Sequence, residues 1–282
     1  MDKYTYKGCT LFLSSFEQVL EDMVSAVDVV VVSPPYNIGS KCPKKIGGRK
    51  LGKYDAKSWG AIEGYEDSMP EDDYQKSQVD FLRLCESKLS PNGLIIYNHK
   101  PRHKNGVLIK PEEWLNVLVK EKTLVYRDEI VWDRGSTHNH CSSYVFPQSE
   151  RIYVLCKPNS KPYFNNCDFY WNPKNKGVGD VWRIPPEKGS FHNAPFPLKL
   201  ARQCIKMWCP PNGLVVDPCS GSGTTMIASI YEGKRFIGSE KLEKYFKKAV
   251  TRIKNEFSPI FNVDSKTKKT EISNNEVCAR IL

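Results

Sequence analysis

The sequence predicts an α/β fold with a mostly parallel sheet and helices on both of its faces. Short β-branched apolar runs alternate along the chain with segments whose apolar residues recur at helical spacing. Five of the six residues in 27–32 are valine, and such a continuous run is typical of a strand buried on both faces. The 282 residues are 40% hydrophobic, which is enough to form the core of one large domain.

Each element follows from a local pattern. The strand at 27–33 ends at Pro34-Pro35, because proline lacks the amide donor that a central ladder needs. The helix at 111–122 opens with proline and carries acidic residues in its first turn. Residues 91–93 (Pro-Asn-Gly) predict a turn. The other expected strands are 10–14, 93–98, 124–132, 151–157, 213–216 and 235–238, and the other expected helices are 71–89, 197–208, 222–231 and 241–257. Residues 158–190 look like a loop, and 258–282 like a polar, mobile tail.

The charge pattern favours a nucleic-acid partner. The net charge is +10 and the isoelectric point is near 9.0. A basic loop, 40–66, follows the valine-rich strand, and a second basic stretch, 99–104, follows the strand at 93–98. Clustered lysine and arginine gain affinity for a polyanion by releasing counterions from its phosphates.

Cysteine usage and hydropathy indicate where such a protein works. None of the ten cysteines forms a CxxC pair, so we expect reduced packing residues. His138 and His140 lie two residues apart with no carboxylate pair nearby, so we expect no metal site. No apolar run approaches 18 residues and no signal peptide is visible. We therefore expect a soluble intracellular protein without a membrane partner, in the cytoplasm, nucleoid or nucleus.

Two motifs lie at the carboxyl ends of predicted strands, which is where parallel α/β sheets bind ligands. The first is Ser33-Pro34-Pro35-Tyr36. The second is DPCSGSGTT at 217–225, a glycine-rich turn that enters a helix but lacks the lysine of a phosphate-binding P-loop. Such a turn suits a nucleoside whose charge is not phosphate. Glu240 ends the next strand, where an acid can accept hydrogen bonds from both ribose hydroxyls.

These two motifs, in this order, resemble the beta class of DNA amino-methyltransferases that use S-adenosylmethionine. The resemblance covers about residues 8–256 and extends to 192–197 (HNAPFP) and 180–182 (DVW). It implies a circularly permuted Rossmann-like methyltransferase fold with a seven-stranded sheet. It also implies a catalytic domain at 1–257 with a target-recognition insertion at about 158–190.

The resemblance assigns roles to single residues. Ser33 Oγ and the Pro34 carbonyl would accept the hydrogens of the target amine, Pro34 and Pro35 would fix the loop, and Tyr36 would stack on the flipped base. Members often have Gly-Asp where this chain has Ser14-Ser15, which makes Ser15 a weaker cofactor contact. The predicted cofactor-binding residues are Ser15, Phe196, Pro197, Asp217, Cys219, Ser220, Gly221, Gly223, Thr224, Thr225 and Glu240.

Double-stranded DNA is the expected substrate. The residues predicted to contact it are Lys41, Lys44, Lys45, Arg49, Lys50, Lys53, Arg102, His103, Lys104, Arg134, His138 and His140. By resemblance, SPPY favours cytosine N4 over adenine N6 as the methylated atom. A second copy of the chain and a cognate restriction endonuclease are the further partners to test. The alternatives are a catalytically silent nucleic-acid-binding subunit, which would have no need of both intact motifs, and an RNA or protein amine methyltransferase.

Overall fold

The computed structural model describes residues 2–23, 26–38, 68–104, 106–135, 145, 147–166, 178–187 and 196–258, together with the backbone of β4 and β5. The strands are β1 (Lys3–Tyr6), β2 (Cys9–Leu13), β3 (Val27–Val32), β4 (Lys45–Ile46), β5 (Arg49–Lys50), β6 (Leu89–His99), β7 (Arg102–Lys104), β8 (Val107–Ile109), β9 (Val125–Asp133), β10 (Ser149–Cys156), β11 (Val181–Arg183), β12 (Leu214–Asp217) and β13 (Arg235–Glu240). The helices are α1 (Phe16–Glu21), α3 (Glu71–Lys88), α4 (Glu112–Lys120), α5 (Leu198–Trp208), α6 (Thr224–Tyr231) and α7 (Glu243–Phe257).

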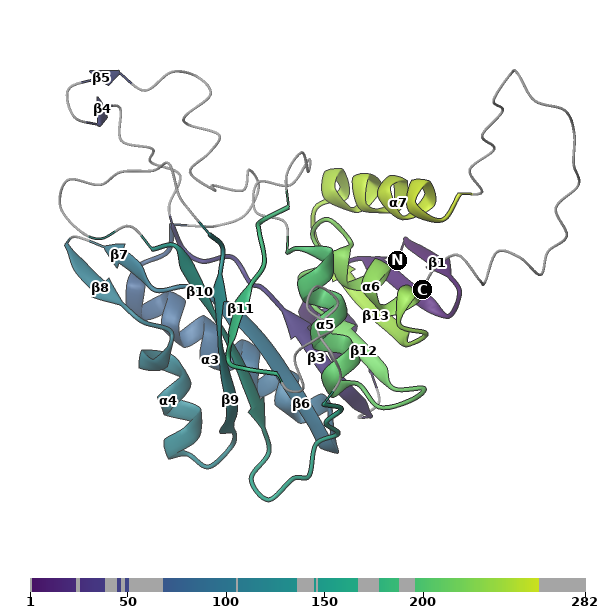
Figure 1. The fold of residues 1–282 in the computed structure, drawn as a ribbon, viewed down its shortest axis with the longest axis horizontal. Helices are drawn as coiled ribbons and strands as arrows, with labels where there is room; N and C mark the ends of the chain where they lie inside the picture. Colours follow the sequence, from purple (N-terminus) through teal and green to yellow (C-terminus); the bar gives the residue numbers. More distant parts are fainter. Residues whose placement is uncertain are drawn as a thin grey trace, which may run out of the picture.

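One nine-stranded sheet forms the centre of the molecule (Figure 1). Its strand order is β1-β2-β13-β12-β3-β6-β10-β9-β11. Within this sheet all strands run in one direction except β1 and β10, which are antiparallel to their neighbours. The predicted α/β class with a mostly parallel sheet is confirmed, and the sheet has nine strands where seven were expected.

Helices cover both faces of the sheet, as predicted (Figure 1). The helices α5, α6 and α7 pack on one face and α1, α3 and α4 on the other. Alternate side chains of β3 serve the two layers, since Val29 and Val31 face the first group of helices and Val30 and Val32 the second. This explains the valine run: every position from 29 to 32 is buried, so none needs a polar side chain.

The structure differs from the predicted elements in four places. The Pro-Asn-Gly sequence at 91–93 lies within β6, where the pairing with β3 shifts register between Val27 and Val29. The turn-forming residues therefore make an irregularity in a longer strand. The basic stretch at 99–104 contributes β7 to a hairpin with β8, and the segment at 158–190 contributes the edge strand β11. Strand β1 and helix α1 have no predicted counterpart, because both are very short.

The chain connections define where a ligand can bind. From β3 the chain passes through α3 to β6, on one side of β3 in the sheet. From β12 it passes through α6 to β13, in the opposite direction and over the opposite face. Because β3 and β12 are parallel neighbours, a crevice opens between their carboxyl ends. Both sequence motifs begin there.

Three findings concern the described residues only. No helix among them is long and apolar enough to cross a membrane. No group of three or more histidine, cysteine or acidic side chains in the described ranges could hold a metal ion. The described cysteines are free thiols, and burial raises the pKa of Cys85, Cys204 and Cys209, as expected for packing residues.

Candidate active site

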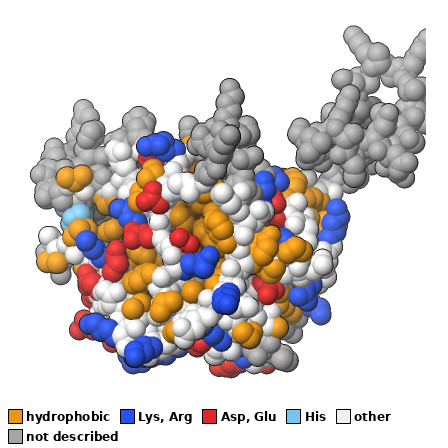
Figure 2. Space-filling model, turned by 60° about the horizontal axis from the view of Figure 1, so that its bottom comes forward, with side chains coloured by type: hydrophobic (Ala, Val, Ile, Leu, Met, Phe, Trp, Pro, Cys, Tyr) orange, Lys and Arg blue, Asp and Glu red, His pale blue; other side chains and the backbone are white. Residues whose placement is uncertain are grey.

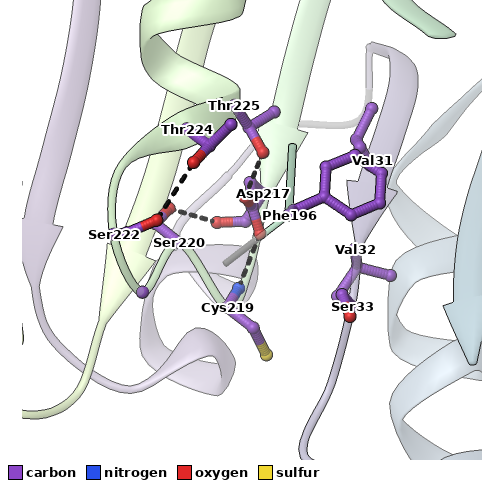
Figure 3. A pocket seen from close by; sticks show the side chains of 11 residues that line it. Val31, Val32, Ser33, Phe196, Asp217, Cys219, Ser220, Ser222, Thr224 and Thr225 are labelled. Atoms are coloured by element: carbon purple, nitrogen blue, oxygen red, sulfur yellow. Dashed lines mark hydrogen bonds between the residues drawn. The ribbon is translucent and has the colours of Figure 1, made fainter. Parts of the chain in front are cut away.

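A pocket occupies the crevice between β3 and β12 (Figure 3). It encloses about 420 Å³ of empty space, including its open mouth. Val31, Val32 and Ser33 form one wall, the loop after β12 forms the opposite wall, and the Phe196 ring projects between them. The full lining is Val31, Val32, Ser33, Phe196, Asp217, Cys219, Ser220, Gly221, Ser222, Thr224 and Thr225. Residues of the two motifs, about 180 positions apart in the sequence, therefore meet in one cavity.

The glycine-rich loop reaches this conformation through two left-handed residues. Gly221 has φ 48° and Gly223 has φ 75°, values that favour glycine. A side chain on Gly223 would also approach Ala249 and Ile253 of α7 at 3.2–3.3 Å. Gly223 itself is the N-cap of α6. The Thr224 hydroxyl bonds to the Ser222 hydroxyl, and the Thr225 hydroxyl donates to Asp217 (Figure 3).

Two buried carboxylates organise the loop. Asp217 accepts hydrogen bonds from the Cys219 amide at 3.0 Å and from the Thr225 hydroxyl at 2.5 Å. Burial, with a smaller contribution from Glu240, raises the pKa of Asp217 to about 7. Glu240 accepts from the amides of Gly221 at 3.0 Å and Leu242 at 2.8 Å. Glu240 therefore holds Gly221, a lining residue, in place without lining the pocket itself.

The SPPY loop is held from three sides. Asn37 takes φ 55°, a left-handed conformation that asparagine tolerates, and its side-chain amide donates to the Met69 carbonyl at 3.1 Å. The Tyr74 hydroxyl of α3 lies 2.8 Å from the Pro35 carbonyl. Arg102 donates to the Tyr36 carbonyl at 2.7 Å. The two prolines and these contacts fix the loop at the end of β3.

A polar network surrounds the Tyr36 hydroxyl. This hydroxyl lies 2.9 Å from Ser33 Oγ, donates to Glu150 at 2.9 Å and accepts from the Asn98 amide at 2.6 Å. Asn98 also donates to Glu150 at 2.9 Å, and Arg134 pairs with Glu150 at 2.9 Å. Burial and the Glu150 carboxylate raise the pKa of Tyr36 well above 10, so the phenol stays protonated. Ser33 is therefore linked through Tyr36 to a buried carboxylate.

Asn98, Glu150 and His99 are site residues that the sequence reasoning missed. His99 is buried with its ring 4.4 Å from the Tyr36 ring, centroid to centroid, and burial lowers the pKa of this histidine to about 3. Asn98 and His99 end β6, so the rule that located Ser33 could have found them. Glu150 is the second residue of β10, which is antiparallel to β6, so the start of β10 lies at the same edge of the sheet as the end of β6.

Most of the predicted cofactor residues gather at the pocket. Phe196, Asp217, Cys219, Ser220, Gly221, Thr224 and Thr225 line it. The other four predicted residues, all of them described, do not line the pocket: Ser15, Pro197, Gly223 and Glu240. Ser15 instead caps α1, where its Oγ accepts from the Gln18 amide at 3.5 Å, and Pro197 is the N-cap of α5. Contacts of these residues with a cofactor remain predictions.

The residues predicted to contact DNA lie in different environments. Arg102 is buried, with its guanidinium 2.6 Å from Glu71, and its contact with DNA stays a prediction. Lys104 also pairs with Glu71 at 3.4 Å, His103 is half-buried in the β7–β8 hairpin, and Arg134 is one-third exposed. Lys41, Lys44, Lys53, His138 and His140 lie outside the described residues, as do the side chains of Lys45, Arg49 and Lys50. On the face drawn in Figure 2, basic and acidic side chains are interspersed around a hydrophobic band.

Comparison with known proteins identifies the family. The N6/N4 methyltransferase model, described as DNA methylase, matches residues 27–251, which include both motifs and the pocket between them. The chain belongs to this family of DNA amino-methyltransferases. The type II methyltransferase M.ScaI of Streptomyces caespitosus is 23% identical over 92% of this chain and 85% of its own length. M.SmaI of Serratia marcescens is 24% identical over 88% of this chain and 91% of its own length.

Solved methyltransferase structures share the fold. The PvuII DNA methyltransferase, named as cytosine-N4-specific, superposes with a TM-score of 0.69 at 17% identity over 88% of this chain and 87% of that one. The complex of M1.HpyAVI with S-adenosylmethionine superposes with a TM-score of 0.59 at 19% identity, over 86% of this chain and 98% of that one. These similarities confirm the predicted Rossmann-like methyltransferase fold.

The lining residues fit a cationic nucleoside better than a nucleotide phosphate. Among the described residues that line the pocket there is one carboxylate, Asp217, and no lysine or arginine. Phe196, Val31 and Val32 supply apolar surface, and Gly221 lets the backbone come close to a ligand. S-adenosylmethionine, which carries sulfonium and ammonium charges on a nucleoside, meets these requirements.

Proposed function

We propose that this protein is a site-specific DNA methyltransferase that transfers a methyl group from S-adenosylmethionine to the exocyclic amine of a flipped-out base, with cytosine N4 as the favoured target. One observation carries the proposal: Ser33 of the catalytic motif lines the same pocket as Asp217 and Gly221 of the cofactor motif. A donor bound by the glycine-rich loop would thus lie directly beside an amine bound at Ser33.

S-adenosylmethionine supplies the electrophilic methyl group. The residues of this chain hold the amine and its lone pair in line with that group, and positioning of this kind accounts for much of an enzyme's acceleration. Ser33 Oγ and the Pro34 carbonyl accept the amine hydrogens, which releases the nitrogen lone pair from conjugation with the ring. No strong base is needed, because the positively charged nitrogen formed by methyl transfer is far more acidic than water and loses its proton readily. The fixed SPPY loop keeps both acceptors aimed between turnovers.

Base recognition requires extrusion of the target from the duplex, at a cost of a few kcal/mol. Stacking on Tyr36 would offset part of this cost, by about 1–3 kcal/mol. One side of the Tyr36 ring already packs on His99, so the base would stack on the other side. Lys100 Nζ lies over the same ring, 5.8 Å from its centroid.

The choice between cytosine and adenine rests on the first motif residue. Both amines present the same hydrogens, so the chemistry of Ser33 alone admits either base. The resemblance of SPPY to cytosine-N4 members favours cytosine, and the name of the PvuII relative points the same way. Association with a second copy or with a restriction endonuclease also belongs to the proposal, since the relatives are type II methyltransferases.

The test is to incubate the purified protein with S-adenosylmethionine and unmethylated DNA, digest the DNA to nucleosides and analyse them by mass spectrometry. N4-methylcytosine is the expected product. N6-methyladenine would keep the reaction class and overturn the base assignment. The absence of both products, in a protein that binds DNA normally, would favour the silent-subunit alternative, and methylation of RNA alone would overturn the substrate class.

A further inference from the structure

We propose that Glu150 is a positioning residue that acts through the Tyr36 hydroxyl to turn the Ser33 O–H away from the pocket. Ser33 Oγ is then left as a hydrogen-bond acceptor for the target amine. The inference rests on the proposed function, because it assigns a direction to the hydroxyl that this function uses. It gives a chemical role to the oxygen of Tyr36, which stacking on a base does not require.

The direction follows from a count of hydrogens. A phenol has one hydrogen, and a carboxylate can only accept, so the Tyr36 hydrogen belongs to the 2.9 Å contact with Glu150. The Asn98 NH₂ group lies 2.9 Å from the same carboxylate, 2.6 Å from the Tyr36 oxygen and 3.4 Å from Ser33 Oγ, so its two hydrogens go to the two nearer oxygens, those of Glu150 and Tyr36. Tyr36 therefore has nothing left to donate to Ser33. The 2.9 Å contact between Ser33 Oγ and the Tyr36 oxygen must use the hydrogen of Ser33.

This direction matters for the chemistry. A free serine hydroxyl can donate a hydrogen bond as readily as it accepts one. If Ser33 donated to the exocyclic nitrogen, it would occupy the lone pair that must attack the methyl group. With its hydrogen committed to Tyr36, Ser33 Oγ offers lone pairs only and can accept a hydrogen of the amine. The Glu150 carboxylate can fix the direction of these hydrogen bonds, because it is buried and is held by Arg134 at 2.9 Å.

The experiment is a double-mutant cycle on the methyl-transfer step. Single-turnover rates are measured with tritiated S-adenosylmethionine and unmethylated DNA, both saturating, for the wild type, Ser33→Ala, Tyr36→Phe and the double variant. Tyr36→Phe keeps the ring and removes only the hydroxyl. We expect Ser33→Ala to lower the rate about 100-fold, the order of magnitude for the removal of one oriented group in an active site. Tyr36→Phe should lower it about 10-fold in the wild type but less than about twofold in the Ser33→Ala background.

Glu150→Gln tests the source of the effect. The amide of the new glutamine can donate to the Tyr36 oxygen. The Tyr36 hydrogen is then free to point to Ser33 Oγ, which reverses the direction of that hydrogen bond. We expect a loss similar to that of Tyr36→Phe, with the dissociation constants for S-adenosylmethionine and DNA unchanged. Glu129→Gln, on the neighbouring strand with its carboxylate half-exposed, and Tyr126→Phe, with a partly exposed ring, are the matched controls. Tyr36→Phe remains informative if Glu150→Gln does not fold.

Three outcomes separate the inference from the proposed function. If Tyr36→Phe costs the same factor in both backgrounds, its hydroxyl does not act through Ser33 and the inference is overturned, while the proposed function stands. If Ser33→Ala keeps the full rate, the acceptor role of Ser33 fails, and the inference fails with it. A wild-type protein that methylates no nucleic acid would instead refute the proposed function.

Discussion

Arg252 of α7 donates to Thr224 Oγ1 at 2.7 Å and, through its other terminal nitrogen, to Glu187 at 2.8 Å. It also donates to the carbonyl and hydroxyl oxygens of Ser222, at 3.2 and 3.1 Å. A single guanidinium thus fastens two lining residues of the pocket to α7. It also ties them to the segment that follows β11, although Arg252 lies outside both sequence motifs.

Loss of this anchor should weaken cofactor binding. Hydrogen bonds to a charged group contribute about 1.5–3 kcal/mol, so Arg252→Gln should raise the dissociation constant for S-adenosylmethionine about 10-fold or more, measured by calorimetry. Lys254→Gln removes a positive charge from an exposed position of the same helix and should change binding less than about twofold. Equal effects of the two variants would mean that only the charge of α7 matters.

Cofactor affinity should depend on pH through Asp217. Its pKa of about 7 means that the empty pocket holds a largely neutral carboxyl group below pH 7. A cationic ligand favours the ionised form, so the dissociation constant for S-adenosylmethionine should fall as the pH rises from about 6 to 8.

Asp217→Asn keeps the shape of this side chain and removes its titration. The variant should bind more weakly at pH 8 and should lose the part of the pH dependence that exceeds the cofactor's own titration. A wild type and variant with parallel pH profiles would show that Asp217 does not change its charge on binding.

Arg102 should matter for stability more than for DNA contact. Removing one partner of a buried ion pair costs about 3–5 kcal/mol, and Arg102 also supports the Tyr36 carbonyl. Arg102→Met should therefore lower the free energy of unfolding by about 3 kcal/mol in urea titrations. Arg83→Met breaks two ion pairs, with Asp80 and Glu121, whose side chains are all more than 40% exposed, and it should cost about 1 kcal/mol or less. The prediction fails if the two losses are equal.

The contrast between Arg102 and Ser33 shows which features could be predicted from the sequence. Ser33 follows a continuous valine run, so its place at a strand end is a local property. Arg102 looks like a surface charge when judged from its sequence neighbours alone, because it lies within a run of basic residues. Only the fold brings Glu71, the first residue of α3, within 2.6 Å of it and offsets the free-energy cost of its burial. Pairings between distant elements have no signature in one sequence.

The same limit applies to Glu150 and to the edge strands. Glu150 precedes an apolar run of the sequence. Its position gives no sign of a functional role until the antiparallel pairing of β10 with β6 places it beside Asn98. The strands β1 and β11, of four and three residues, are too short to show a period. By contrast, the glycine-rich turn after β12 has a defined place in the pocket because positive φ angles at Gly221 and Gly223 are local requirements.

The basic loop should set the salt dependence of DNA binding. Removing one lysine–phosphate interaction reduces the slope of log affinity against log salt concentration by about 0.9. Lys44→Gln with Lys45→Gln should therefore flatten the slope by about 1–2 in fluorescence anisotropy titrations with duplex DNA. Lys120 and Lys122 are the control pair for the two loop lysines. They precede β9, which runs in the same direction as β3. The start of β9 therefore lies at the opposite edge of the sheet from Ser33, which follows the end of β3. Lys120→Gln with Lys122→Gln should leave the slope unchanged, and an equal flattening by both pairs would exclude a specific role for the loop.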